Sequence, residues 1–162
     1  MLLPNKGAEK RNKTRSNLPF QMALYVNLWI FPIWLSIAII SLDAKYNSLT
    51  NIYKLLMVAV FLILSVSESL KLYLGYLGNL GGKIPELTSC WLILMLIQLP
   101  LEIFLLFDQG TLLRDSEVFI NFFMTCFFLV EVITGTIALK NLADQRAKTF
   151  YLAQLCNTYY KD

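Results

Sequence analysis

The sequence contains no histidine, few cysteines and few charged residues. Among its 162 residues there are three cysteines, and only 15% of the residues are charged. The lack of imidazole excludes catalytic dyads or triads built on histidine, and His-ligated zinc, haem and di-iron sites. Three cysteines are too few, and odd in number, for a disulfide scaffold. What dominates instead is apolar sequence.

Hydrophobic residues make up 57% of the chain. An ordinary soluble domain is about 45–50% apolar and about 25% charged. A soluble globule of 18.6 kDa could not hide so much apolar surface from water. A disordered chain requires the opposite composition, low hydrophobicity with high net charge. The composition therefore indicates a membrane protein, and the length suits one domain.

Four apolar stretches are long enough to cross a bilayer, whose core of about 30 Å requires about 20 residues per helix. Lipid offers no hydrogen bonds to the backbone, so the spans are expected to be helices. The fold class predicted is all-α, a polytopic antiparallel bundle of four transmembrane helices joined by short loops. The predicted organisation is a basic N-terminal segment at 1–21, a membrane domain at 22–139 with spans at about 22–42, 55–77, 87–107 and 118–139, and a short tail at 140–162.

Positive charges predict the orientation. Ten lysines and arginines fall on the side of the two chain ends, and three fall on the other side. Because cytoplasmic loops carry the excess of basic residues, both termini are predicted to be cytoplasmic. The basic run from Lys10 to Arg15 is also expected to attract anionic lipids of the inner leaflet. On this topology the glycosylation sequon at Asn12 never reaches the lumen and is a chance match.

Two ionisable residues lie together in the second span. Intramembrane charges are costly and count as functional hypotheses. Glu68 and Lys71 are three residues apart, so they share a helix face and can form an ion pair. Lys71 is near enough to the cytoplasmic end to extend its ammonium group toward the interface. The pair is predicted to serve helix packing or, alternatively, to bind a partner directly.

Gln98, Glu102 and Glu131 are the polar candidates of the third and fourth spans. Neither glutamate has a cation at helical spacing. Each is expected to stay protonated, or to form a hydrogen bond across helices. The partners considered are Asn27, Gln98, Asn121 and Thr125. A proton or ion pathway through the carboxyl groups is the alternative.

Prolines, small residues and the tail carry further structural expectations. Pro32 and Pro100 are expected to kink their helices. The glycine-rich run at 75–82 is placed at the end of the second helix and its turn, where glycine tolerates a positive φ. The tail is expected to have some amphipathic helical character on the membrane face. Small residues that allow close helix approach are Ser65, Ser69, Gly75, Gly135 and Ala138.

The sequence offers no catalytic constellation. No nucleophile has an activating base nearby, and no phosphate-binding glycine loop follows a strand. We therefore predict no enzyme activity, no catalytic residues, no cofactor and no metal. No nucleic-acid partner and no small-molecule substrate are predicted.

One segment resembles a known family. The segment has an acid, a base three residues later, an aromatic residue, two glycines and an asparagine. These residues are Glu68, Lys71, Tyr73, Gly75, Gly78 and Asn79. The segment resembles the signature of the transmembrane protein 17 family, to which transmembrane proteins 80 and 216 are related. The similarity covers Leu18 to Leu142 and continues at residues 18–22, 25, 27, 31–32, 84–87, 91–92 and 98–101.

The resemblance implies a non-enzymatic structural component of the ciliary transition zone. Proteins of this family belong to a Meckel-syndrome, or tectonic-like, complex that forms a diffusion barrier and supports cilium assembly and hedgehog signalling. The expected partners are other membrane and soluble proteins of that complex and the bilayer itself. The alternative is a small oligomeric transporter or channel that uses Gln98, Glu102 and Glu131.

Overall fold

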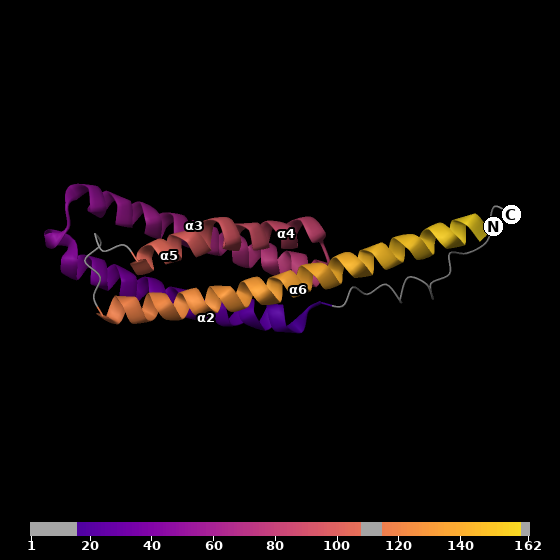
Figure 1. Ribbon diagram of the computed structural model, residues 1–162, viewed down its shortest axis with the longest axis horizontal. Coiled ribbons are helices and arrows are strands. Elements are labelled where there is room, and N and C mark those ends of the chain that lie inside the picture. The colour runs from indigo at the N-terminus through magenta and orange to yellow at the C-terminus, as the bar shows by residue number, and fades with distance from the viewer. Residues whose placement is uncertain (1–15, 108–114, 160–162) are drawn as a thin grey trace.

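The protein is an elongated bundle of antiparallel helices. A computed structural model describes residues 16–107 and 115–159. Within these ranges all secondary structure is helical, and four helical stretches are long and apolar enough to cross a membrane. The predicted fold class is therefore confirmed. The elements are α2 (Leu18–Lys45), η1 (Tyr46–Ser48), α3 (Asn51–Gly81), α4 (Ile84–Ile93), η2 (Leu94–Gln98), α5 (Leu99–Phe107) and α6 (Asp115–Tyr159), and Figure 1 shows how they run side by side.

Local sequence signals fix where the helices begin and end. Asn17 caps α2 by accepting a hydrogen bond from the Phe20 amide, which satisfies one of the unpaired donors of the first turn. Helix α3 ends at Gly81 and is capped by Gly82, whose φ of 60° lies in the left-handed region that favours glycine. The rest of the glycine-rich run is helical, because α3 continues to Gly81. Pro85 then lies in the first turn of α4, where its missing N–H costs nothing.

The two intramembrane prolines have different surroundings. Pro32 lies inside α2, which continues through it from Leu18 to Lys45. Pro100 follows η2, a π-helical segment that joins α4 to α5. Proline removes one backbone donor and crowds the preceding turn, and a π-helical turn is one way to accommodate that strain. The interruption at Pro100 is thus a wider helical turn and not a break.

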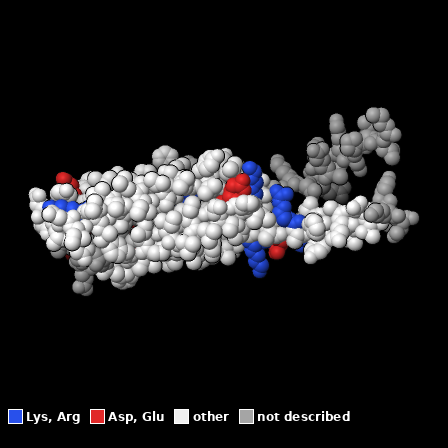
Figure 2. All heavy atoms as spheres, turned by 90° about the horizontal axis from the view of Figure 1, so that it is seen from above, with Lys and Arg blue, Asp and Glu red and all other residues white. Residues whose placement is uncertain are grey.

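Buried side chains form two apolar clusters along the bundle, while the outside is also apolar. One cluster includes Trp34, Leu64 and Phe128. The other lies near the start of α2 and includes Phe20 and Leu87. Most of the bundle surface in Figure 2 carries no charge, and the charged groups gather at its two ends. In a membrane protein the apolar outside faces lipid, so only the helix interfaces are built for specific packing.

The C-terminal tail differs from the expectation. Helix α6 continues without interruption through the predicted span and on to Tyr159, and it projects beyond the other helices (Figure 1). No glycine or proline stands between Leu139 and Tyr159, so nothing in this stretch ends the helix. The predicted helical character of the tail is confirmed. Leu142 is buried in the bundle and does not lie on a membrane face, and the position of the helix beyond it relative to the membrane stays a prediction.

The orientation of the bundle stays a prediction. The start of α2, the α3–α4 turn and the projecting part of α6 share one end, because Asn17 bonds to Asn79 and Arg146 bonds to Gly82. This arrangement fits the predicted antiparallel order. The basic run from Lys10 to Arg15 and the sequon at Asn12 lie outside the described residues.

Candidate functional site

A cluster of polar side chains lies in the centre of the bundle. Its members come from α2, α3, η2 and α6, so every membrane-spanning stretch contributes at least one side chain. All are between 0% and 1% exposed. They are Asn27, Glu68, Lys71, Gln98 and Glu131.

Glu68 receives hydrogen bonds from three elements. Asn27 of α2 donates through Nδ2 to Oε1 at 2.7 Å. Gln98 of η2 donates through Nε2 to Oε2 at 2.7 Å. Lys71 Nζ lies 3.0 Å from the same Oε2, which is the pair that their spacing predicts. A buried charge is tolerated when it is paired and hydrogen-bonded in this way.

Lys71 joins two helices. Its Nζ lies 2.7 Å from Oε2 of Glu131 on α6, in addition to its contact with Glu68. The ammonium group also lies 4.8 Å from the ring centre of Phe128, within the range of a cation–π contact. The expectation that Lys71 extends to the interface is wrong: its side chain is 0% exposed, because two carboxylates hold it inside.

The partner of Glu131 was missed by sequence reasoning. Spacing along one helix reveals neighbours three or four residues away, and none of those is a cation for Glu131. Lys71 is 60 residues earlier in the chain. Of the partners proposed from sequence, Asn27 and Gln98 donate to Glu68, and Asn27 also lies within reach of Glu131.

The helical period of α3 explains which motif residues point inward. Its buried residues recur every three or four positions, at 57, 60, 61, 64, 67, 68, 71, 75, 78 and 79. This stripe includes Glu68 and Lys71 as well as Gly75, Gly78 and Asn79. Tyr73 falls outside the stripe and is 66% exposed, so it faces the surroundings of the bundle.

Gly75 and Gly78 allow close packing against α3. A Cβ at Gly75 would lie 2.8 Å from the Leu24 side chain and 2.9 Å from the Cys90 sulfur. At Gly78 it would lie 2.5 Å from the backbone nitrogen of Leu87, a distance at which a real Cβ atom is essentially never found. The glycines therefore set how closely α4 approaches α3.

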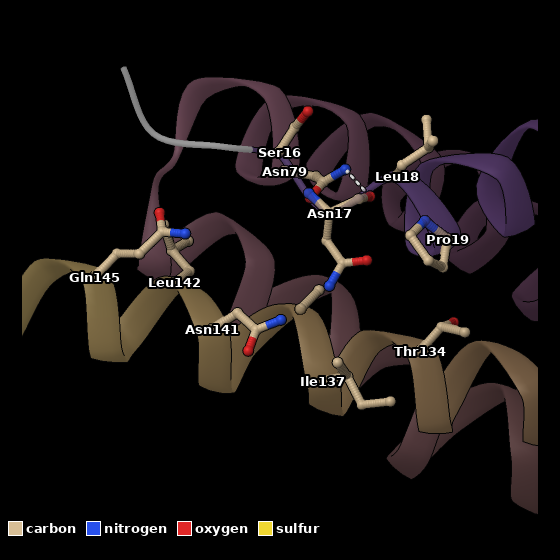
Figure 3. A pocket seen from close by; sticks show the side chains of 11 residues that line it. Ser16, Asn17, Leu18, Pro19, Asn79, Thr134, Ile137, Asn141, Leu142 and Gln145 are labelled. Carbon is tan, nitrogen blue, oxygen red and sulfur yellow. Dashed lines mark hydrogen bonds between the residues drawn. The ribbon is translucent and has the colours of Figure 1, made fainter. Parts of the chain in front are cut away.

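Asn79 ties the start of α2 to the end of α3. Its Oδ1 accepts from the Asn17 amide at 3.0 Å, and its Nδ2 donates to the Asn17 carbonyl at 3.1 Å and to Gln21 Oε1 at 2.8 Å. A cavity of about 420 Å³ opens beside this contact. Figure 3 shows it between the start of α2 and α6, with Asn141 and Gln145 on its α6 wall.

Glu102 stands apart from the central cluster. It is 0% exposed. Among the described residues its carboxyl oxygens form no hydrogen bond with the central cluster, and the polar side chain near it is that of Trp34. The predicted partner Asn121 is engaged elsewhere: it accepts from Trp34 Nε1 at 3.0 Å and donates to the Leu105 carbonyl. Thr125 donates to the Asn121 carbonyl of its own helix. The structure therefore does not join Glu102 to Glu131.

A second interhelical ion pair lies at the other end of the bundle. Lys45 Nζ, at the end of α2, is 2.8 Å from Glu117 in the first turn of α6. Sequence reasoning missed this pair too, because 72 residues separate its members. It joins the two helices at the end opposite to Asn79.

The chemistry of the central cluster is that of helix association. The side chains are closed off from the surroundings, and they form hydrogen bonds with one another across four helical stretches. Within residues 16–107 and 115–159, no group of three or more potential ligands could hold a metal ion. The arrangement fixes which faces of the helices meet.

Comparisons with known proteins agree with the sequence motif. A family model named Transmemb_17, described as "Predicted membrane protein", matches residues 22–128. Transmembrane protein 17B of Danio rerio is 37% identical over 86% of this chain and 73% of its own length. Transmembrane protein 17 of Gallus gallus is 39% identical over 87% and 68%, and the Homo sapiens protein is 38% identical over 91% and 74%. These names describe membrane proteins and not enzymes. No solved structure matches.

Proposed function

Because the chain belongs to the transmembrane protein 17 family, we propose that it is a non-enzymatic structural component of the ciliary transition zone. There it assembles with membrane and soluble proteins of a tectonic-like complex, contributes to the diffusion barrier, and supports cilium assembly and hedgehog signalling. The observation that carries the proposal is the family match, which covers 86–91% of the chain in the three relatives described above. The chain itself is a multi-pass membrane protein.

The geometry suits a structural role inside the membrane. The polar groups at the centre bond to one another, and the outside of the bundle offers lipid or neighbouring membrane proteins an apolar surface. The expected mechanism is lateral: a correctly packed bundle presents its faces and its loops to other members of the complex. Loss of internal packing then causes loss of assembly.

Two glutamates provide a matched test of this mechanism. Glu68 and Glu86 each have a lysine three residues away, but Glu68 is buried while the side chain of Glu86 is 24% exposed and pairs with Lys83 at 3.4 Å. We expect Glu68→Ala to reduce co-precipitation with tectonic-like proteins far more than Glu86→Ala. The measurement is co-precipitation of tagged variants expressed at equal levels in ciliated cells. Equal recovery of partners by both variants would refute the mechanism.

Transport remains the weaker alternative. It relies on Gln98, Glu102 and Glu131 as groups along one pathway. Gln98 and Glu131 are 0% exposed and bond to Glu68 and Lys71, while Glu102 lies apart. Flux in liposomes that contain the purified chain would be the sign of a transporter.

A further inference from the structure

The cavity beside the contact between Asn17 and Asn79 has the size of a ligand site. Its volume is about 420 Å³, and small-molecule sites in proteins measure about 300–1,000 Å³. Helix α6 supplies one wall, from Thr134 to Gln145. An α-helix rises about 1.5 Å per residue, so this wall is about 16 Å long. The cavity is therefore long enough for an extended molecule that lies along α6.

The lining of the cavity changes in polarity at the predicted edge of the membrane. Thr134, Ile137 and Ala138 line it from inside the predicted span at 118–139. Its side-chain amides all lie outside the predicted spans, and they belong to Asn17, Asn79, Asn141 and Gln145. One part of the cavity thus lies at the depth of acyl chains and the other at the depth of lipid headgroups. This match does not depend on which end of the bundle is cytoplasmic.

The apolar part of the cavity opens on the outside of the bundle. Leu18 on the α2 wall is 67% exposed, and Ile137 on the α6 wall is 50% exposed. Ile137 lies within the predicted span, where the outside of a helix bundle is in contact with lipid. A lipid can therefore enter the cavity sideways from the bilayer.

Two of the amides are available to a ligand. Asn79 is already bonded to Asn17 and Gln21. The side-chain amides of Asn141 and Gln145, in contrast, form no hydrogen bond with any described residue, and Figure 3 shows both on the α6 wall. An amide offers two donors and one acceptor, so these groups suit a hydroxyl group, which both donates and accepts.

The lining selects against a charged headgroup. None of the described residues that line the cavity is charged, whereas anionic lipid headgroups are bound by clusters of lysine and arginine. Arg146 follows Gln145 in sequence, but it does not line the cavity and donates to the Gly82 carbonyl at 2.7 Å. A phosphate group at this site would lack a cation to pair with. An uncharged polar group fits the lining better.

We propose that this cavity binds an uncharged membrane lipid that carries a hydroxyl group, of the sterol or diacylglycerol type. The hydroxyl group bonds to Asn141 and Gln145, and the apolar body lies along Leu18 and Ile137. This inference goes beyond the proposed function and does not depend on it, because it concerns a lipid site of the bundle itself and not where in the cell the chain acts.

Photolabelling of the full chain in phosphatidylcholine nanodiscs tests the proposal. The probes are cholesterol, dioleoylglycerol and dioleoylphosphatidylserine, each with a diazirine near its polar group. We expect cholesterol or dioleoylglycerol to label residues 16–19 or 134–145, and excess unlabelled lipid of the same kind to prevent this. Whichever of the two labels the cavity identifies the lipid type. Equal saturable labelling by phosphatidylserine, or no saturable labelling by either hydroxyl lipid, overturns the proposal.

A matched pair of variants locates the site. Asn141 and Ala143 are both exposed on α6, but only Asn141 lines the cavity, because residues two apart point to different faces of a helix. Asn141→Trp fills the cavity and is expected to reduce the saturable labelling by about tenfold or more. Ala143→Trp is expected to leave it unchanged, and circular dichroism checks that both variants stay helical. Equal labelling of the two variants overturns the proposal.

Competition by an analogue without the hydroxyl group tests the polar contact. For the unsubstituted chain, the deoxy analogue of the labelling lipid is expected to compete about fivefold less well than the lipid itself, which corresponds to about one hydrogen bond. In a chain with Asn141→Ala and Gln145→Ala, the two are expected to compete equally. A preference for the hydroxyl lipid that survives in this double variant overturns the role given to the two amides.

Discussion

At the scale of the residue, Lys71 is the cation that joins the two carboxylates of the buried polar cluster. Its ammonium group lies 3.0 Å from Glu68 on its own helix and 2.7 Å from Glu131 on α6. A compact ammonium can donate in several directions, which suits two carboxylates on different helices. Replacement of this lysine by an uncharged residue is expected to destabilise the bundle, because two buried carboxylates would then lack their cation.

Lys71→Met is expected to destabilise the bundle strongly. Removal of one partner from a buried ion pair costs about 3–5 kcal/mol. Lys83→Met is the matched control: the side chain of Lys83 is 54% exposed and its pair with Glu86 spans 3.4 Å, so the cost is about 1 kcal/mol or less. Denaturant unfolding in micelles, followed by circular dichroism, measures both. A Lys71→Met loss as small as that of Lys83→Met would contradict the role given to Lys71.

Sequence reasoning reached the ion pair but not the cluster. Glu68 and Lys71 are near in sequence, and the helical period alone predicts that they share a face. The bonds to Glu131, Asn27 and Gln98 depend on which helices are neighbours and on their relative rotation. One sequence holds no information of that kind, so these partners could be found only from the fold.

At the scale of the element, glycine determines the α3–α4 interface. The backbone of Leu87 on α4 lies where a Cβ of Gly78 would be. At Gly81, by contrast, the nearest atom to an added Cβ would be 3.6 Å away, on the flexible side chain of Lys83. The two glycines are three residues apart on the same helix, yet only one of them is required by packing.

Gly78→Ala is expected to destabilise the protein, and Gly81→Ala is not. Overpacking a tight interface costs about 1–3 kcal/mol, and here a backbone atom must move. At Gly81 the better helix propensity of alanine favours the helix by up to about 1 kcal/mol. Thermal unfolding of both variants in micelles is the measurement. Gly78→Ala with the stability of the unsubstituted chain would show that the helices do not approach as closely as described.

The sequence predicts the elements better than their irregularities. Long apolar runs locate all four helices, and Gly82 locates the end of α3. The π-helical turn at 94–98 was not predicted, since Pro100 signals strain without saying how it is relieved. The length of α6 was missed because its polar half resembles a tail in composition, although it contains no helix breaker.

At the scale of the whole molecule, the distribution of charge predicts how the bundle is oriented in the membrane. The projecting end of α6, Lys83 and the start of α2 share one end, and Lys45 and Glu117 lie at the other. The excess of basic residues predicts that the first of these ends is cytoplasmic. The projecting helix would then be available to soluble cytoplasmic proteins.

Cysteine labelling tests this orientation. In a chain whose Cys126 and Cys156 are replaced by alanine, Asn47→Cys and Lys83→Cys each add one exposed thiol at opposite ends of the bundle. On plasma membrane of intact cells, an impermeant maleimide is expected to label Asn47→Cys, and to label Lys83→Cys only after permeabilisation. The reverse labelling pattern would show that the topology is opposite to the predicted one.

The most direct test of the central claim is the position of the protein in a ciliated cell. The chain, tagged at its C-terminus, is imaged beside a basal-body marker and an axonemal marker. The account predicts a ring or spot between the two markers. A diffuse pattern over the plasma membrane or endoplasmic reticulum, with a tag that leaves cilium assembly intact, would contradict the transition-zone role.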